Sequence, residues 1–347
     1  MCGFKRLPQI YTYLTEKLNK QPYSEQLIYN KAMKISPKFD LTANCVLFEG
    51  DCLNLLKQIP DKFVKLVVTS PPYNLGKEYE TRRDLKNYLE LQKKIIEESV
   101  RILDDSGSIC WQVGNYVDNG KIIPLDIVLY PIFEALGLQL RNRIVWHFGH
   151  GLHASKRFSG RYEVIMWFTK SNDYTFNLDP IRVPQKYPQK KHFKGPNKGE
   201  LSGNPLGKNP SDIWDIPNVK SNHIEKTIHP CQFPIELIER LVLSMTNEND
   251  WVFDPFMGVG STAIASLMHN RKAIGAEIMP EYISVAKDRI KKAEKGKLQM
   301  RPMDRPVYDP IAPAKITPPK TIKLQKTGPI QNQLFEKKGK YKVRKSK

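Results

Sequence analysis

The sequence predicts a doubly wound α/β protein with three layers and one small irregular insertion. Short runs of β-branched and other apolar residues alternate with longer amphipathic segments of helical period. The run at 63–69 is short and rich in valine, as expected of a strand that is buried on both faces of a parallel sheet. Between 180 and 226 the periodicity is lost, and Pro, Gly, Asn and Lys dominate.

This alternating pattern assigns the elements in order. Strands are predicted at 46–48, 63–69, 108–113, 139–148, 162–169, 251–253 and 273–276. Helices are predicted at 53–59, 85–103, 122–136, 234–245, 261–269 and 282–292. The order predicts a parallel sheet made of two halves, 45–179 and 227–295, which flank the insertion at 180–226. Residues 1–44 are expected to form a helical lead-in, and residues 296–347 a basic, disordered tail.

Charge is the unusual feature of the composition. The 347 residues include 55 Lys and Arg against 36 Asp and Glu, which gives a net charge of +19. Residues 291–347 hold 17 basic and 4 acidic residues, and residues 180–226 hold 9 and 4. A positive charge of this size, concentrated in two stretches, predicts a polyanionic partner.

Several classes of protein are disfavoured by the composition. No run of about 18 apolar residues could span a bilayer, and residues 1–20 lack a secretory signal, so we expect a cytoplasmic protein. Five cysteines without a CxxC pair predict neither a zinc site nor a disulfide framework. The histidines at 147, 150 and 153 have no carboxylate or thiol at ligand spacing, so no metal is predicted.

The segment Asp254–Thr262 lies between a predicted strand and a predicted helix. Gly258 and Gly260 would let the backbone approach a ligand closely, and Glu277, at the tip of the next strand, could accept hydrogen bonds from two ribose hydroxyls. Alone, such a turn could be only a tight corner, but with the carboxylate it favours a nucleoside cofactor. A third glycine for a pyrophosphate is missing, which favours S-adenosylmethionine over NAD.

The segment Thr69–Asn74 follows the predicted strand at 63–69. Pro71 and Pro72 lack N–H groups and fix the backbone, so the carbonyls of Ser70 and Pro71 become rigid acceptors. Tyr73 adds a flat face on which a base could stack while those acceptors hold its exocyclic amine. A simple strand terminator is the alternative interpretation, and it leaves the aromatic residue unexplained.

These segments together resemble the beta class of S-adenosylmethionine-dependent DNA amino-methyltransferases, over roughly 46–290. The family's catalytic motif is matched by Ser70–Tyr73, its cofactor motif by Asp254–Thr262, and a third segment by His229–Pro234. Gly50–Asp51 matches the family's segment near the cofactor adenine. The resemblance implies a Rossmann-like methyltransferase sheet, with a catalytic half at 45–179, a target-recognition insertion at 180–226 and a cofactor-binding half at 227–295.

The resemblance also implies roles for individual residues. The predicted catalytic residues are Ser70, Pro71, Pro72 and Tyr73. The predicted S-adenosylmethionine-binding residues are Asp51, Cys52, His229, Phe233, Pro234, Asp254, Phe256, Gly258, Gly260, Ser261, Thr262 and Glu277. Basic residues of the loop before the strand at 162–169 and of the insertion predict contacts with DNA phosphates, and a solvent-exposed loop is the alternative in each case. These residues are Lys156, Arg157, Arg161, Lys190, Lys191, Lys194 and Lys198.

The implied activity is site-specific methylation of an exocyclic amine on a base extruded from double-stranded DNA. The Ser-Pro-Pro-Tyr variant favours cytosine N4, and adenine N6 is the alternative. We expect a restriction-modification system with a cognate endonuclease, no membrane, and a monomer or homodimer. A catalytically inactive DNA-binding protein and an RNA methyltransferase stay open as further alternatives.

Overall fold

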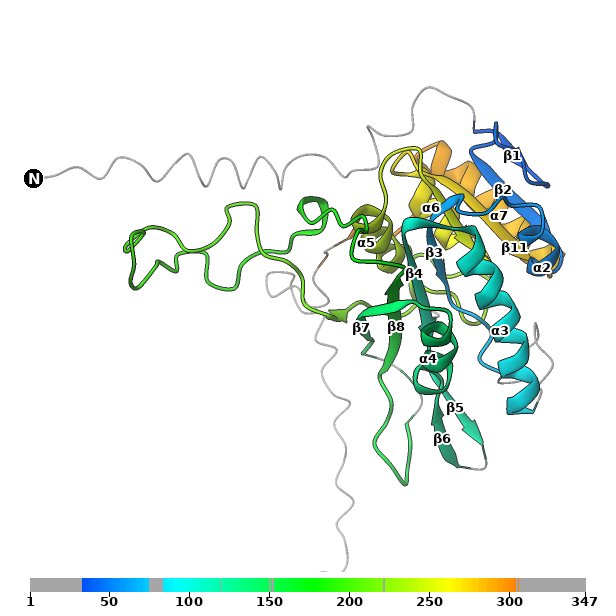
Figure 1. Cartoon of the computed structure of the whole chain (residues 1–347), viewed down its shortest axis with the longest axis horizontal. Helices are drawn as coiled ribbons and strands as arrows, with labels where there is room; N and C mark the ends of the chain where they lie inside the picture. Colours follow the sequence, from blue (N-terminus) through cyan, green and yellow to red (C-terminus); the bar gives the residue numbers. More distant parts are fainter. Residues whose placement is uncertain are drawn as a thin grey trace, which may run out of the picture. The chain divides into compact units, whose positions relative to one another are not determined.

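A nine-stranded sheet forms the centre of the part of the chain that the structure describes (Figure 1). The computed structural model describes residues 33–74, 84–118, 120–149, 151, 153–220, 222–303 and 305. The strand order is β1-β2-β11-β10-β3-β4-β8-β7-β9. The strands of this sheet are β1 (Ile35–Ser36), β2 (Cys45–Glu49), β3 (Val64–Thr69), β4 (Leu103–Val113), β7 (Gln139–His147), β8 (Tyr162–Thr169), β9 (Ile213–Asp215), β10 (Trp251–Asp254) and β11 (Lys272–Glu277).

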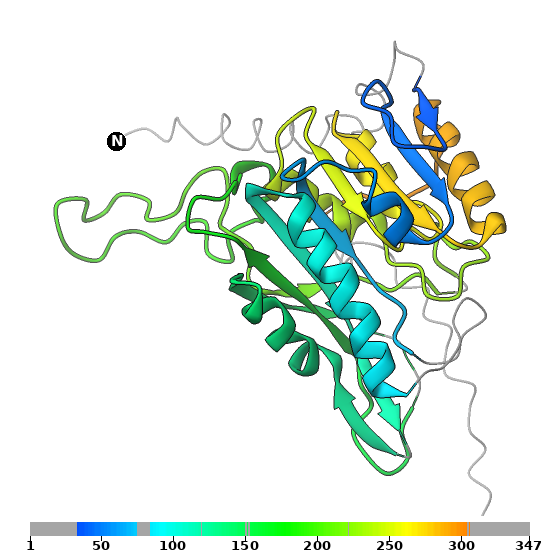
Figure 2. The same cartoon turned by 45° about the vertical axis from the view of Figure 1, so that its right-hand side comes forward.

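Helices cover both faces of this sheet (Figures 1 and 2). Side chains alternate along each strand, so Val67 packs into one core while Leu66 and Val68 pack into the other. The core around Val67 also contains α2 (Cys52–Leu56), α3 (Leu85–Ile102) and α4 (Leu125–Ala135). The opposite core contains α5 (Ile235–Met245), α6 (Ser261–Leu267) and α7 (Pro280–Glu294). The predicted three-layer, doubly wound α/β fold is confirmed.

The sheet is mixed, which corrects the prediction that all of its strands run parallel. Strand β8 runs antiparallel to both β4 and β7. The reason is the connection between β7 and β8, because the described residues of 148–161 form no helix and two strands joined without a crossover helix lie antiparallel. The six strands from β1 to β4 in the sheet order are parallel, and these carry both predicted motifs.

A small hairpin replaces the start of the helix predicted at 122–136. Strand β5 (Asn115–Asp118) pairs with β6 (Lys121–Pro124), and α4 begins only at Leu125. Pro124 explains this start, because a proline disfavours helical backbone at the residue before it. Pro124 itself has extended backbone angles and caps the helix.

The two ends of the described region also differ from expectation. Residues 33–44 form no helix, and Ile35–Ser36 pair as β1 with β2. Beyond α7, Leu298 and Met300 pack against the core, and Arg301 pairs with buried Glu236. Residues up to 303 therefore belong to the packed domain rather than to a disordered tail. The rest of the predicted lead-in and tail, 1–32 and 306–347, lies outside the described residues.

The described residues of the insertion form one strand and a long irregular loop. The short helix η1 (Asp179–Ile181) leads into residues 183–208, which we call the arm, and in which isolated bridges join Val183 to Lys208 and Lys191 to Leu201. After the arm, β9 joins the sheet beside β7, and Trp214 is buried in the core. The end of the insertion is thus part of the sheet itself. Across the described ranges, no helix is both long and apolar enough to cross a membrane.

Candidate active site

Strands β3 and β10 are parallel neighbours, which decides where the two main motifs lie. Leu66 and Val67 pair with Val252 and Phe253, so the loops after both strands leave the same edge of the sheet. Thr69 Oγ1, at the end of β3, donates a hydrogen bond to Asp254 Oδ1, at the end of β10, over 2.6 Å. Two segments that are 185 positions apart in the sequence are therefore in direct contact.

Asp254 lies beneath this edge and is fully buried. Besides the Thr69 hydroxyl, its carboxylate accepts from Thr262 Oγ1 at 2.6 Å and from the Phe256 amide at 3.0 Å. Burial raises the pKa of Asp254 to about 6, and the three hydrogen bonds act in the opposite direction. Asp254 is thus a structural link between the end of β3, the turn after β10 and the start of α6.

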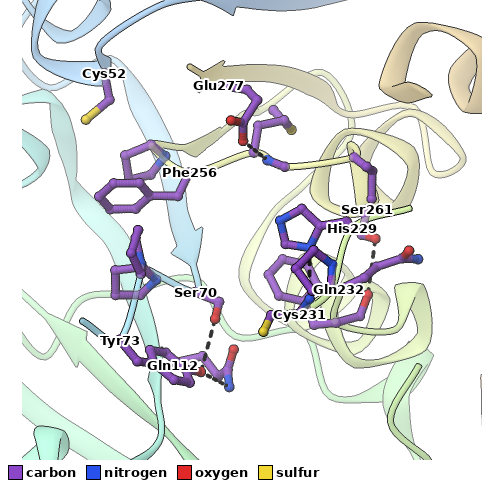
Figure 3. Close-up of a pocket in the computed structure, with 18 of the residues that line it drawn as sticks. Cys52, Ser70, Tyr73, Gln112, His229, Cys231, Gln232, Phe256, Ser261 and Glu277 are labelled. Carbon is purple, nitrogen blue, oxygen red and sulfur yellow. Dashed lines mark hydrogen bonds between the residues drawn. The ribbon is translucent and has the colours of Figure 1, made fainter. Parts of the chain in front are cut away.

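A cavity of about 690 Å³ opens above this link and is shared by both motifs (Figure 3). Twelve of the predicted site residues line it: Asp51, Cys52, Ser70, Pro71, Pro72, Tyr73, His229, Phe233, Phe256, Gly258, Ser261 and Glu277. Four predicted cofactor residues are not in its lining, namely Pro234, Asp254, Gly260 and Thr262. A volume of this size is typical of a cofactor or small-ligand site.

The glycine turn after β10 depends on backbone angles that favour glycine. Gly258 and Gly260 have φ values of 53° and 80°, in the left-handed region. The amide of Gly258 donates to Glu277 Oε2 at 3.0 Å, and the amide of Met279 donates to Oε1 at 2.9 Å. Burial raises the pKa of Glu277. Each carboxylate oxygen keeps a second lone pair, so Glu277 can still accept ribose hydroxyls from the cavity side.

The His229–Pro234 segment packs beside this turn. The His229 ring contacts the Tyr282 ring at a centroid distance of 4.6 Å, and its Nδ1 accepts from the Cys231 amide at 3.2 Å. Burial and the nearby Lys226 lower the pKa of His229 to about 4, so its imidazole is neutral at pH 7. The Ser261 hydroxyl donates to the Phe233 carbonyl at 3.1 Å, which holds the segment against α6.

The loop that follows β3 contains the predicted catalytic residues Ser70–Tyr73 and is described as far as Asn74. Asn74 is buried and has a φ of 60°, a left-handed conformation that asparagine tolerates well. The Tyr73 hydroxyl lies 3.1 Å from Ser70 Oγ and accepts from Gln112 Nε2 at 2.7 Å (Figure 3). It also donates to Glu163 at 3.1 Å. Burial raises the pKa of Tyr73 well above its ordinary value, so the phenol keeps its proton.

The Gly50–Asp51 segment enters the cavity from β2. Asp51 caps α2, because its carboxylate accepts from the Leu53 amide at 2.9 Å. Cys52 is buried behind it, and burial raises the pKa of its thiol to about 12. A neutral thiol gives this wall of the cavity an apolar surface.

Other residues of the lining were not predicted from the sequence. Tyr88 and Gln92 come from α3, Trp146 from β7, and Gln112 and Glu163 from β4 and β8. Asn218 and Lys220 follow β9. A polar residue inside an otherwise apolar strand was an available signal for Gln112 and Glu163, since a buried polar group usually has a specific partner.

The predicted DNA-contacting residues lie outside the cavity. Lys156 and Arg157 are exposed in the loop between β7 and β8, and Arg161 donates to the Gly160 carbonyl at 3.0 Å. The four predicted lysines of the arm are all exposed, namely Lys190, Lys191, Lys194 and Lys198. Within the described region, no group of three or more His, Cys, Asp or Glu side chains could hold a metal ion.

Comparison with known proteins identifies the family. A family model described as DNA methylase, of the N6 and N4 type, matches residues 64–288. The chain is 58% identical over 241 residues to type II methyltransferase M.BglII of Bacillus subtilis, an alignment that covers 69% of this chain and 67% of that protein. It is 35% identical to M.ScaI of Streptomyces caespitosus over 72% of this chain and 82% of that protein. The chain therefore belongs to the N6/N4 DNA methylase family.

Solved structures agree with this assignment. The PvuII DNA methyltransferase, described as cytosine-N4-specific, matches with a TM-score of 0.58 over 79% of this chain and 99% of that chain, and its 20% identity supports the fold alone. A putative DNA modification methylase of Thermus thermophilus, solved with S-adenosyl-L-methionine, is 28% identical and has a TM-score of 0.51. It covers 72% of this chain and 96% of that chain.

Proposed function

We propose that this methyltransferase is site-specific and modifies an exocyclic amine in double-stranded DNA, with cytosine N4 as the favoured position. The observation that carries this proposal is the shared cavity, in which the loop after β3 and the turn after β10 face one space. A methyl donor held by one loop would then meet a base held by the other. Positioning of this kind can supply much of the rate enhancement of a methyl transfer.

The methyl donor is S-adenosylmethionine, and the residues present fit it. Gly258 has left-handed backbone angles and no Cβ facing the cavity, and a Cβ built there would lie 3.4 Å from His229. Glu277 offers free lone pairs to ribose hydroxyls, and Phe256 offers an aromatic wall. When bound, the group supplies an electrophilic methyl on a sulfonium. Asp51 and Cys52, across the same cavity, would contact its adenine end.

The base would be held by the catalytic loop. Ser70 Oγ and the Pro71 carbonyl would accept the two hydrogens of the exocyclic amine, which makes its lone pair available for attack. Reaching an amine inside a duplex requires the base to leave the stack, and Tyr73 would provide the stacking surface. Trp146 and Phe148 add further aromatic lining from β7 and the residue after it.

The preference for cytosine N4 over adenine N6 comes from Ser70. Adenine N6 is the alternative, since YhdJ of Escherichia coli, which is 32% identical, is named a DNA adenine methyltransferase. Ser70 favours cytosine N4 through its resemblance to the Ser-Pro-Pro-Tyr variants. A serine hydroxyl and an aspartate carboxylate can both accept a hydrogen bond from the amine. The residue type therefore favours one base without excluding the other.

DNA binding would involve the arm and the β7–β8 loop. Lys190, Lys191, Lys194 and Lys198 are exposed on the arm, as are Lys156 and Arg157 on the loop. Exposed cations contact phosphates without reading sequence, so these residues would orient the duplex over the cavity. We place the enzyme in a restriction-modification system with a cognate endonuclease, since relatives are named type II methyltransferases.

The test is transfer of tritium from labelled S-adenosylmethionine to duplex DNA and, separately, to RNA, followed by chromatography of the nucleosides. We expect label in DNA and in N4-methylcytosine. Label in N6-methyladenine would replace the favoured base by the alternative. Label only in RNA would contradict the substrate, and S-adenosylmethionine binding without transfer to either would indicate an inactive DNA-binding protein.

A further inference from the structure

Glu163 is a carboxylate in the cavity wall that belongs to none of the recognised motifs. It is the second residue of β8 and pairs with Trp146 of β7 across the strand. Its side chain accepts from the Tyr73 hydroxyl at 3.1 Å and also contacts the Gln112 amide. Gly114 leaves room for this cluster, because a Cβ there would lie 3.1 Å from Tyr73 and 3.4 Å from Glu163.

The hydrogen bonds of this cluster fix the direction of the Ser70 hydroxyl. Tyr73 has one hydroxyl hydrogen, and it is donated to Glu163, since an ionised carboxylate can only accept. Gln112 Nε2 donates to the Tyr73 oxygen at 2.7 Å. In the contact between Ser70 and Tyr73, at 3.1 Å, Ser70 must therefore be the donor. The free lone pairs of Ser70 Oγ are then available to an amine hydrogen.

We propose that Glu163 is the final proton acceptor of methyl transfer and that it acts on the substrate through Tyr73 and Ser70. This rests on the proposed catalytic role of Ser70–Tyr73. As the amine nitrogen bonds the methyl carbon, the sulfur keeps the electrons of the broken C–S bond. One proton then moves along each link: from the nitrogen to Ser70 Oγ, from Ser70 to the Tyr73 oxygen, and from Tyr73 to Glu163. Ser70 and Tyr73 end neutral, and Glu163 ends as a carboxylic acid.

Three other carboxylates near the cavity are less suitable. Asp51 caps α2 by accepting from the Leu53 amide at 2.9 Å. Asp254 is fully buried and accepts three hydrogen bonds from Thr69, Thr262 and the Phe256 amide. Glu277 accepts from two backbone amides on the cofactor side. Glu163 is connected to Ser70 by two hydrogen bonds and lines the cavity, through which its proton can leave between turnovers. A serine hydroxyl cannot keep an additional proton at neutral pH, so the relay supplies the basic group that Ser70 lacks.

The experiment compares Glu163→Gln, Tyr73→Phe and the double variant in the full chain. Gln is isosteric with Glu and keeps an acceptor, so Glu163→Gln removes basicity rather than volume. We expect single-turnover methyl transfer to fall by about tenfold or more in Glu163→Gln, with S-adenosylmethionine affinity unchanged. The double variant should be no slower than the slower single variant, because both remove the same relay. Glu248→Gln, at an exposed position after α5 and outside the cavity lining, is the matched control.

The pH profile separates a proton acceptor from a structural residue. Burial raises the pKa of Glu163 above its ordinary value of 4.5. As the pH is lowered, the wild-type rate should therefore begin to fall before pH 4.5 is reached, because Glu163 becomes protonated and can no longer accept a proton. Asp254 also titrates in this range. Tyr73, Cys231 and Lys220 lie around the cluster, and all four residues are the same in wild type and in Glu163→Gln. The profile of Glu163→Gln should lack one acid step.

Failure of this proposal differs from failure of the proposed function. If wild-type protein transfers no methyl group to DNA, the proposed function is wrong. If wild-type protein is active and Glu163→Gln matches its rate, the relay is wrong. Losses that multiply in the double variant, or an acid limb that is unchanged in Glu163→Gln, would also overturn the relay.

Discussion

The cavity and the arm use their polar side chains in opposite ways. Beneath the cavity, one buried carboxylate, Asp254, accepts three hydrogen bonds and joins two loops. On the arm, six lysines are exposed, namely Lys186, Lys190, Lys191, Lys194, Lys198 and Lys208. A buried network depends on every member, because each missing partner leaves a desolvated polar group. Exposed charges act through their sum and are screened by salt. Substitutions should therefore have large, specific effects in the cavity and small, cumulative effects on the arm.

The largest expected effect is that of Asp254→Ala. It leaves the hydroxyls of Thr69 and Thr262 and the Phe256 amide without an acceptor in a buried position. We expect the free energy of unfolding to fall by about 4 kcal/mol, measured by urea denaturation. Asp212→Ala, an exposed carboxylate after the arm, should change it by less than about 0.5 kcal/mol. Equal losses in both variants would remove the distinction between the two regions.

The second largest expected effect is the pH dependence of the contribution that Asp254 makes to the free energy of unfolding. Its folded pKa of about 6 lies above the ordinary 3.8, so the folded state binds the proton more tightly. This contribution to stability is complete below pH 3.8 and is lost as the pH rises through about 6. Relative to Asp254→Asn, wild-type stability should fall by up to about 3 kcal/mol between pH 4 and 7. A difference that stays flat or rises over this range would contradict the burial argument.

One glycine in the cavity and one on the arm share the left-handed backbone conformation, so the effects of a Cβ in the two regions can be compared directly. Gly258 in the cavity and Gly195 on the arm both have positive φ values, 53° and 86°. Gly258→Ala adds a methyl group 3.4 Å from His229, whereas a Cβ at Gly195 has no neighbour within 4 Å. Calorimetry should show S-adenosylmethionine binding weakened by about tenfold, or about 1.4 kcal/mol, in Gly258→Ala. Gly195→Ala should bind it as wild type does, and a similar loss there would point to strain alone.

The smallest effects belong to single lysines of the arm. Replacing Lys190, Lys191, Lys194 or Lys198 by Gln should weaken DNA binding by less than the cavity substitutions. Removing one lysine–phosphate interaction should reduce the slope of log affinity against log salt by about 0.9. S-adenosylmethionine binding should stay unchanged. If replacing a single lysine abolished the sequence preference, the arm would read bases. It would then resemble the cavity in depending on individual side chains.

Much of the site could be predicted because its residues are adjacent in the sequence. Ser70–Tyr73 and Asp254–Thr262 are contiguous, and each follows a strand of the parallel part of the sheet. Parallel neighbours end at the same edge, so the meeting of the two loops followed from strand order once β3 and β10 were neighbours.

The remaining features depend on pairing between distant strands. Gln112 and Glu163 reach Tyr73 because β4 and β8 pair antiparallel, with Gln112 opposite Ile165. The alternation of strands and helices predicted a parallel partner instead, and a one-residue change of register would turn Glu163 to the other face. Likewise, no periodicity marks the three residues of β9 inside a Pro- and Lys-rich insertion. Their place is set by the edge of β7, a tertiary contact.

The most direct test of the account measures cofactor occupancy and methyl transfer in the same sample of Ser70→Ala. Ser70 lines the cavity on the side of the loop after β3, whereas the cofactor motif follows β10. With saturating tritiated S-adenosylmethionine and duplex DNA, we expect wild-type occupancy and a single-turnover rate lower by about 100-fold or more. A wild-type rate, or a loss of transfer that only follows a loss of occupancy, would contradict the claim that the two loops divide the work of holding base and methyl donor.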